Sequence, residues 1–174
     1  MVTAVRNPWT VAAEPVPAID ALADVFRWAV SYAVLAPSGH NTQPWRFRLE
    51  DDAIELHADR TRALPVVDPD DRELTIACGA ALLHLRLALE HAGILHEIEL
   101  LPDGADVDLL ARVRVVSFFP AQPEEDALFA AIPLRRTNRQ PFDDRPLPVA
   151  LASTLAETVA AEGAWLRTVD GDAR

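Results

Sequence analysis

The sequence contains no lysine, because all sixteen of its basic residues are arginine. This absence excludes every chemistry that needs a lysine amine, including Schiff-base catalysis, a phosphate-binding Walker lysine and a lysine general base. An arginine side chain stays protonated in proteins. The cations of this chain can therefore bind and orient anions, but they cannot transfer protons.

Cysteine is almost absent, since Cys78 is the single one among 174 residues. One cysteine excludes an internal disulfide framework and any thiolate-rich zinc or iron–sulfur site. Cys78 lies in an apolar segment, so we expect it to be a buried hydrophobic residue and not a nucleophile. The five histidines lack the spacing of metal ligands, and the sequence predicts no metal site.

Long apolar runs and an excess of positive charge are missing as well. No apolar segment approaches the roughly 20 residues that span a bilayer, and no signal-peptide core is visible near the N-terminus. The chain has 27 acidic and 16 basic residues, a formal net charge of −11, which repels nucleic acid and anionic membranes. We therefore expect a cytoplasmic protein that has neither a nucleic acid nor a membrane as a partner.

The patterns that are present predict an α+β fold with a mixed or antiparallel sheet flanked by helices. Apolar residues recur at helical spacing in some segments and alternate with polar residues in others. Helices are expected at 18–35, 68–91, 124–132 and 149–162, a hairpin at 45–58, strands at 94–101 and 109–119, and the start of another strand at 165–169. Asp68 and Pro69 form a cap signal for the second helix. That helix is apolar on most of its circumference, which predicts a long central helix.

The segment APSGHNTQPW, residues 36–45, is a polar loop between the first helix and the first strand. It offers the hydroxyl of Ser38, the bare backbone of Gly39 and the carboxamides of Asn41 and Gln43. Such a mixed set of donors and acceptors suits a neutral heterocycle with alternating carbonyls and ring nitrogens. The alternative is a simple turn that caps the following strand, with its residues chosen for turn geometry.

The segment RRTNR, residues 135–139, places three guanidinium groups within five residues of a strongly acidic chain. Arginine forks match phosphate oxygens, and the hydroxyl of Thr137 adds a neutral donor, so the segment is typical of a phosphate site. The alternative is a solvated patch that pairs with nearby acidic residues.

Together, these two segments carry a resemblance to the FMN-dependent nitroreductase family. APSGHNTQPWRF resembles the family's Pro-Ser-x-x-Asn-x-Gln-Pro-Trp flavin segment, and RRTNR resembles its Arg-x-Ser-x-Arg phosphate segment. The order of parts is similar to a divergent, mycobacterial-type branch of NAD(P)H nitroreductases. In ordinary members the arginine motif comes first, whereas here it comes about a hundred residues after the other.

The resemblance implies a tandem pair of half-units, with residues 1–123 as a first nitroreductase-like half and 124–174 as the start of a second, incomplete half. Each half would retain the flavin motif that the other has lost. The family's flavin site lies at a dimer interface. This arrangement therefore implies a homodimer that supplies the missing wall, a missing C-terminal half that completes the site, or an FMN site that is incomplete.

Carried over residue by residue, the resemblance implies FMN as cofactor. Ser38, Asn41 and Gln43 would meet the isoalloxazine edge, Arg135, Thr137, Asn138 and Arg139 would meet the phosphate, and Pro37 and Gly39 would shape the backbone approach. The implied function is hydride transfer from NAD(P)H through the flavin to a small-molecule acceptor, such as a nitroaromatic or a quinone. The flavin performs that chemistry, so no catalytic acid or base is expected. The alternatives are a protein that binds or sequesters FMN without turnover and a truncated remnant that binds nothing.

Overall fold

The structure is a computed structural model that describes residues 15–120 and 127–169. The chain divides into two compact units, a first unit of residues 1–137 and a second unit of residues 138–174. The predicted boundary between residues 123 and 124 lies outside the described residues. It remains a prediction about the two half-units.

A four-stranded sheet forms the first unit's framework, and all of its strand pairs are antiparallel. The strands are β1 (Trp45–Leu49), β2 (Ala53–Ala58), β3 (Ile94–Leu100) and β4 (Leu109–Phe118), in the spatial order β1-β2-β4-β3. The predicted hairpin is confirmed, with Phe47 opposite Leu56 across β1 and β2. Of the two sheet types expected, the described residues form the antiparallel one.

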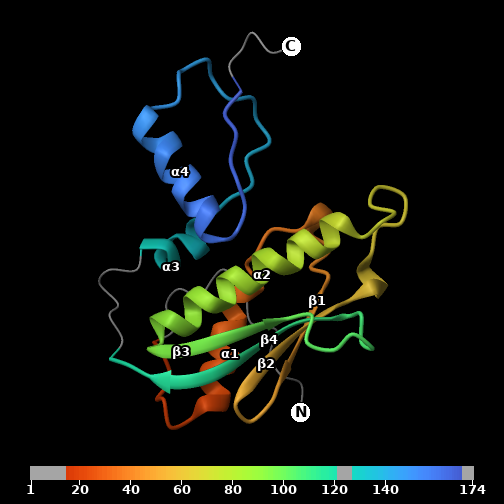
Figure 1. Cartoon of the computed structure of the whole chain (residues 1–174), viewed down its shortest axis with the longest axis vertical. Helices are drawn as coiled ribbons and strands as arrows, with labels where there is room; N and C mark the ends of the chain where they lie inside the picture. Colours follow the sequence, from red (N-terminus) through yellow and green to blue (C-terminus); the bar gives the residue numbers. More distant parts are fainter. Residues whose placement is uncertain (1–14, 121–126, 170–174) are drawn as a thin grey trace. The chain divides into compact units, whose positions relative to one another are not determined.

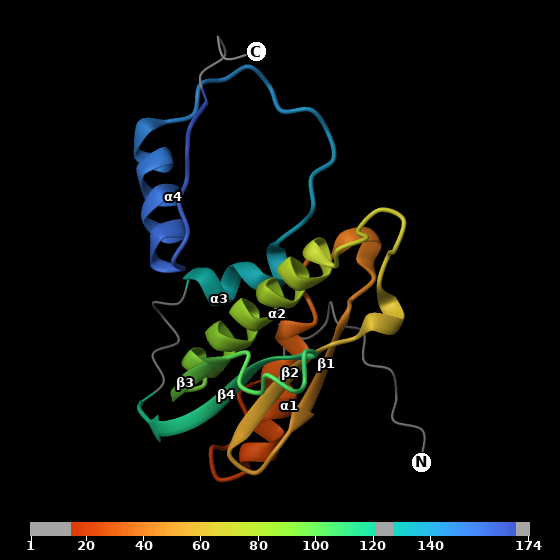
Figure 2. The same ribbon diagram turned by 45° about the vertical axis from the view of Figure 1, so that its right-hand side comes forward.

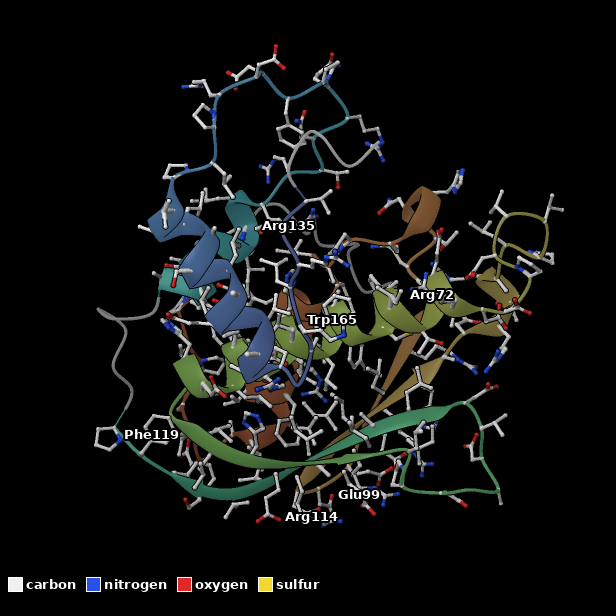
Figure 3. The ribbon with its side chains drawn as sticks, turned by 45° about the horizontal axis from the view of Figure 1, so that its top comes forward. Arg72, Glu99, Arg114, Phe119, Arg135 and Trp165 are labelled. Atoms are coloured by element: carbon white, nitrogen blue, oxygen red, sulfur yellow. The ribbon has the colours of Figure 1, made fainter. Side chains whose placement is uncertain are left out.

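Two helices, α1 (Leu22–Ala33) and α2 (Arg72–His91), pack against one face of this sheet (Figure 1). Their apolar faces meet the inward side chains of the strands in one core, where Phe26, Leu85, Ile54 and Val113 are almost completely buried. Since the hydrophobic side chains alternate along the strands, the opposite face of the sheet carries charged residues. Figure 3 shows Glu99 and Arg114 on that outer face, away from α2.

The helix α2 begins later than the sequence predicts. Asp68 lies outside the helix, but its side chain still accepts the backbone N–H groups of Glu73 at 3.1 Å and Leu74 at 2.9 Å. The predicted burial around most of the circumference is not seen in the described residues. Only one face is buried, and Ile76 on the other side is 58% exposed. The structure therefore shows a long helix with one buried face, not a central helix enclosed on all sides.

The short helix α3 (Ala127–Ala131) and the 3-10 helix η4 (Ile132–Leu134) complete the first unit. Figure 2 shows α3 beside α2. Phe129 fixes this packing, because its ring lies 3.8 Å from the His91 ring, 4.6 Å from that of Tyr32 and 5.7 Å from that of Trp28, centroid to centroid. This anchor determines where the segment that follows η4 emerges.

In the second unit, α4 (Val149–Ala161) confirms the predicted last helix. The expected strand at 165–169 is wrong, since no strand is assigned in the described part of this unit. A strand needs a partner to satisfy its backbone, and among the described residues no strand pairs with this segment. Trp165 is 81% exposed.

Candidate functional site

The polar loop at residues 36–45 has an unusual backbone. His40, Asn41 and Gln43 all have positive φ angles, of 50°, 57° and 51°. Side chains other than glycine rarely adopt this left-handed region, and each such residue costs on the order of 1 kcal/mol or more. Strain of this kind persists only where surrounding contacts enforce it, and it is concentrated at functional sites.

The polar side chains of this loop hold it in place. The Ser38 hydroxyl accepts the backbone N–H of Gln43 at 2.9 Å, and the Gln43 Nε2 donates to the carbonyl of Val34 at 3.4 Å. Gly39 lies close to α2, where an added Cβ would be 3.1 Å from the Glu73 Oε2. Pro37, His40 and Asn41 are exposed, so the Asn41 carboxamide faces outward.

Arg135, the first residue of the arginine motif, lies near the C-terminal end of the first unit's sequence, and its side chain contacts the residue before this loop. Its Nη2 donates to the carbonyl of Leu35 at 3.2 Å, and its Nη1 donates to the Thr137 hydroxyl at 3.3 Å. Leu35 directly precedes the loop segment. Arg135 directly follows η4, and Figure 3 shows it near α3. The packing of Phe129 of α3 against Tyr32 holds this part of the chain beside α1.

The common point of attachment is the C-terminal end of α1 together with the two residues that follow it, Val34 and Leu35. Gln43 donates to Val34, Arg135 donates to Leu35, and His84 of α2 hydrogen-bonds the backbone of Tyr32. The C-terminal end of a helix carries unpaired carbonyls and a partial negative charge, so cationic and N–H donors are stabilising there. The helix end thereby draws side chains from both predicted motifs to one place.

His84 and Arg135 each retain a buried nitrogen, Nδ1 and Nε respectively, that has no hydrogen-bond partner in the described part of the chain. Because Nδ1 is unpaired, the bond to Tyr32 is made by Nε2. Burial lowers the pKa of His84, and the nearby Arg135 charge lowers it further, although the bond to Tyr32 opposes both. The imidazole is therefore neutral at pH 7, beside a fixed cation.

Seven of the nine predicted site residues lie in the first unit: Pro37, Ser38, Gly39, Asn41, Gln43, Arg135 and Thr137. The other two, Asn138 and Arg139, belong to the second unit, where both are exposed. There the Asn138 side chain accepts the Gln140 N–H at 3.0 Å and donates to the Gln140 carbonyl at 3.2 Å.

The cavity beside Gly39 is small. Its volume is about 10 Å³, and it is lined by Thr42, Arg62 and Glu73 among others. That volume holds about one water molecule. The loop thus offers an outward polar rim and not a closed chamber, and a flat ring bound against it would need a second wall.

Sequence reasoning missed two residues of this region, His84 and Arg62. His84 faces the helix end described above, and Arg62 donates from its Nη1 to the carbonyl of Thr42 at 3.0 Å. Both contacts join segments distant in sequence, and no spacing pattern signals them. The prediction for Cys78 is confirmed, because it is buried, its Sγ donates to the Pro44 carbonyl at 3.3 Å, and desolvation raises its pKa to about 11.

Within residues 15–120 and 127–169, no group of three or more His, Cys, Asp or Glu side chains could hold a metal ion. None of the helices described there has both the length and the apolar character needed to cross a membrane.

Comparison with known proteins supports the resemblance. The chain is 40% identical over 147 residues to "Putative NAD(P)H nitroreductase Rv3131" of Mycobacterium tuberculosis (strain ATCC 25618 / H37Rv), a match that covers 84% of this chain and 42% of that protein. It is 39% identical over 154 residues to "Putative NAD(P)H nitroreductase acg" of the same strain, covering 87% and 46%. The predicted resemblance to nitroreductases is confirmed, and the chain spans less than half the length of these two relatives.

A solved structure of a nitroreductase family protein from Streptococcus pneumoniae TIGR4 aligns with a TM-score of 0.45 and 19% identity, covering 74% of this chain and 86% of that one. No protein-family model matches the sequence.

Proposed function

We propose that this chain provides a flavin site of an FMN-dependent oxidoreductase, which takes hydride from NAD(P)H and passes electrons to a nitroaromatic, a quinone or a similar acceptor. The observation that carries the proposal is the hydrogen bond from Arg135 Nη2 to the Leu35 carbonyl. It joins two segments 100 residues apart, each of which resembles one half of a nitroreductase flavin site.

The existing contacts of the loop determine what each side chain can still offer to a ring. Ser38 already accepts a hydrogen bond from Gln43 N, so its O–H remains as a donor. The Gln43 Nε2 is engaged with Val34, so its carbonyl oxygen remains as an acceptor. Asn41 is exposed and can supply both. This alternation of donor and acceptor fits the polar edge of an isoalloxazine. Pro37 and Gly39 would shape the backbone so that the ring can approach it closely.

At the other end, Arg135 and Thr137 would hold the phosphate, together with Asn138 and Arg139. Arg135 has a buried Nε–H group without an acceptor among the described residues, and a phosphate oxygen would satisfy it. The Leu35 carbonyl fixes the orientation of the guanidinium before any ligand arrives, which reduces the entropy lost on binding.

When bound, FMN supplies the hydride-transfer chemistry, and the protein supplies binding and orientation. The residues named here therefore bind and position, and none is assigned a proton-transfer role. The second wall of the ring site would come from another copy of the chain or from the remainder of a longer protein.

A flavin titration tests the proposal. We expect the purified protein to bind FMN, seen as quenching of flavin fluorescence, and to bind riboflavin more weakly because riboflavin lacks the phosphate. Adding NAD(P)H should then bleach the bound flavin, and an acceptor should restore its colour.

Binding without bleaching would favour the alternative of an FMN-sequestering protein. If the protein binds no FMN at concentrations high enough for a second copy to supply the missing wall, and a chain extended to the length of its relatives also binds none, the proposal is contradicted.

A further inference from the structure

Arg62, in the 3-10 helix η3 (Arg60–Arg62), contacts the polar loop from the side of the sheet. Its Nη1 donates to the carbonyl of Thr42 at 3.0 Å. Thr42 has an ordinary helical backbone conformation, but it lies between Asn41 and Gln43, which are both left-handed. Arg62 therefore contacts the loop between two of its left-handed residues.

The carbonyl of Thr42 and the N–H of Gln43 belong to one rigid peptide plane. The N–H donates to the Ser38 hydroxyl at 2.9 Å, and the carbonyl accepts from Arg62. The plane is thus held at both of its polar ends. Because a peptide plane can rotate only as a whole, these two bonds together fix the backbone that carries the Gln43 side chain.

Asp59 holds Arg62 in turn. An Asp59 carboxylate oxygen lies 3.5 Å from the Arg62 Nε, while the Thr61 N–H and hydroxyl donate to the other oxygen at 3.2 and 2.6 Å. The bond from the Thr61 hydroxyl is the main reason why the pKa of Asp59 is lowered. The carboxylate therefore remains charged and keeps the guanidinium directed at the loop.

We propose that Arg62 is a positioning residue for the ring-binding loop, acting through the Thr42–Gln43 peptide plane. The proposal rests on the proposed function, because the loop is taken to hold a flavin ring. It assigns Arg62 to the ring end of that site, whereas Arg135 serves the phosphate end. The two residues should therefore differ in which part of the ligand they affect.

The test compares Arg62→Gln with Arg60→Gln in the same short helix. Arg60 pairs with Asp71 and with Asp108, the latter at 2.7 Å, so its variant controls for a general loss of stability. We expect Arg62→Gln to weaken FMN and riboflavin by the same factor, roughly fivefold to tenfold for a half-exposed charge-assisted bond. Arg60→Gln should leave both affinities within about twofold, and Arg62→Lys should restore part of the loss because it keeps a cationic donor.

Hydrogen exchange without any flavin makes the test independent of the proposed function. The Gln43 amide should exchange faster in Arg62→Gln than in the wild type or Arg60→Gln, since the peptide plane has lost one of its two bonds. Unchanged Gln43 exchange, or a loss of affinity equal in the Arg60 and Arg62 variants, would overturn the proposal. If wild-type protein binds no flavin but the exchange result holds, the proposed function fails while the positioning role of Arg62 stands.

Discussion

Substituting Arg135 by methionine tests the contact between the arginine motif (135–139) and the start of the polar loop. Methionine retains most of the aliphatic stem of arginine and removes the guanidinium. The apolar contacts made by that stem should therefore be largely preserved. The hydrogen bond to the Leu35 carbonyl is lost, together with the favourable position of a cation at the C-terminal end of α1. We expect both stability and phosphate-dependent flavin binding to fall.

The size of the effect follows from these two contributions. A hydrogen bond from a charged group is worth about 1.5–3 kcal/mol, and a cation at a helix C-terminus about 0.3–1 kcal/mol. Arg135 is only half-buried, so solvent screening favours the lower end. A loss of about 1.5 kcal/mol in the free energy of unfolding corresponds to a decrease in Tm of roughly 5 °C for a unit of this size.

Thermal unfolding and flavin titration together measure the result. Arg136→Met is the matched control, because Arg136 donates to the carbonyls of Pro133 and Arg135 within its own segment. The control should change the free energy of unfolding by less than about 0.5 kcal/mol. Two results would refute a stabilising, phosphate-binding Arg135. One is equal stability of the two variants, and the other is a loss of riboflavin affinity in Arg135→Met as large as the loss of FMN affinity.

Four further outcomes are expected. Ser38→Ala should cost roughly 1 kcal/mol in chemical denaturation, because the Gln43 N–H loses its acceptor; an unchanged midpoint would contradict this. His40→Gly should raise stability by about 0.5 kcal/mol in the same assay, since glycine relieves the left-handed backbone at a smaller entropic cost; a decrease would count against strain there. Cys78 should react with a thiol reagent at pH 8 only on unfolding, because burial raises its pKa, and rapid labelling of folded protein would disprove its burial. Burial is the main reason why the pKa of His84 is lowered in the folded protein. Below about pH 6.5 the unfolded chain therefore binds more protons at this residue than the folded protein does. The free energy of unfolding should fall as the pH drops through that range. His84→Gln should reduce this slope in pH-dependent unfolding, and an identical slope would exclude His84 as its source.

The regular elements of the fold could be predicted because their patterns are local. The alternation of apolar and polar residues from Trp45 onward predicts the hairpin, and Gly93, with a φ of 77°, follows the end of α2 as expected. The sequence predicts too early a start for α2, because Asp68 caps the helix from outside, across a turn in which Asp71 is left-handed. A cap signal in the sequence identifies the capping residue, but it does not show how many turn residues separate that residue from the start of the helix.

The candidate site could be predicted only in part. The residue types in the two motifs indicate a ring edge and a phosphate, and the structure brings Gln43 and Arg135 to the neighbouring carbonyls of Val34 and Leu35, directly after α1. The contacts of His84 and Arg62 depend on how α2 and η3 pack against that loop, which no local pattern encodes. Whether these residues bind FMN remains a prediction.

A crystal structure of the protein with FMN would test the central claim most directly. The account predicts one flavin whose ring edge lies within hydrogen-bond distance of Asn41 and Gln43 and whose phosphate contacts Arg135 and Thr137. A flavin bound away from the α1 C-terminus, or one whose phosphate leaves Arg135 untouched, would contradict it.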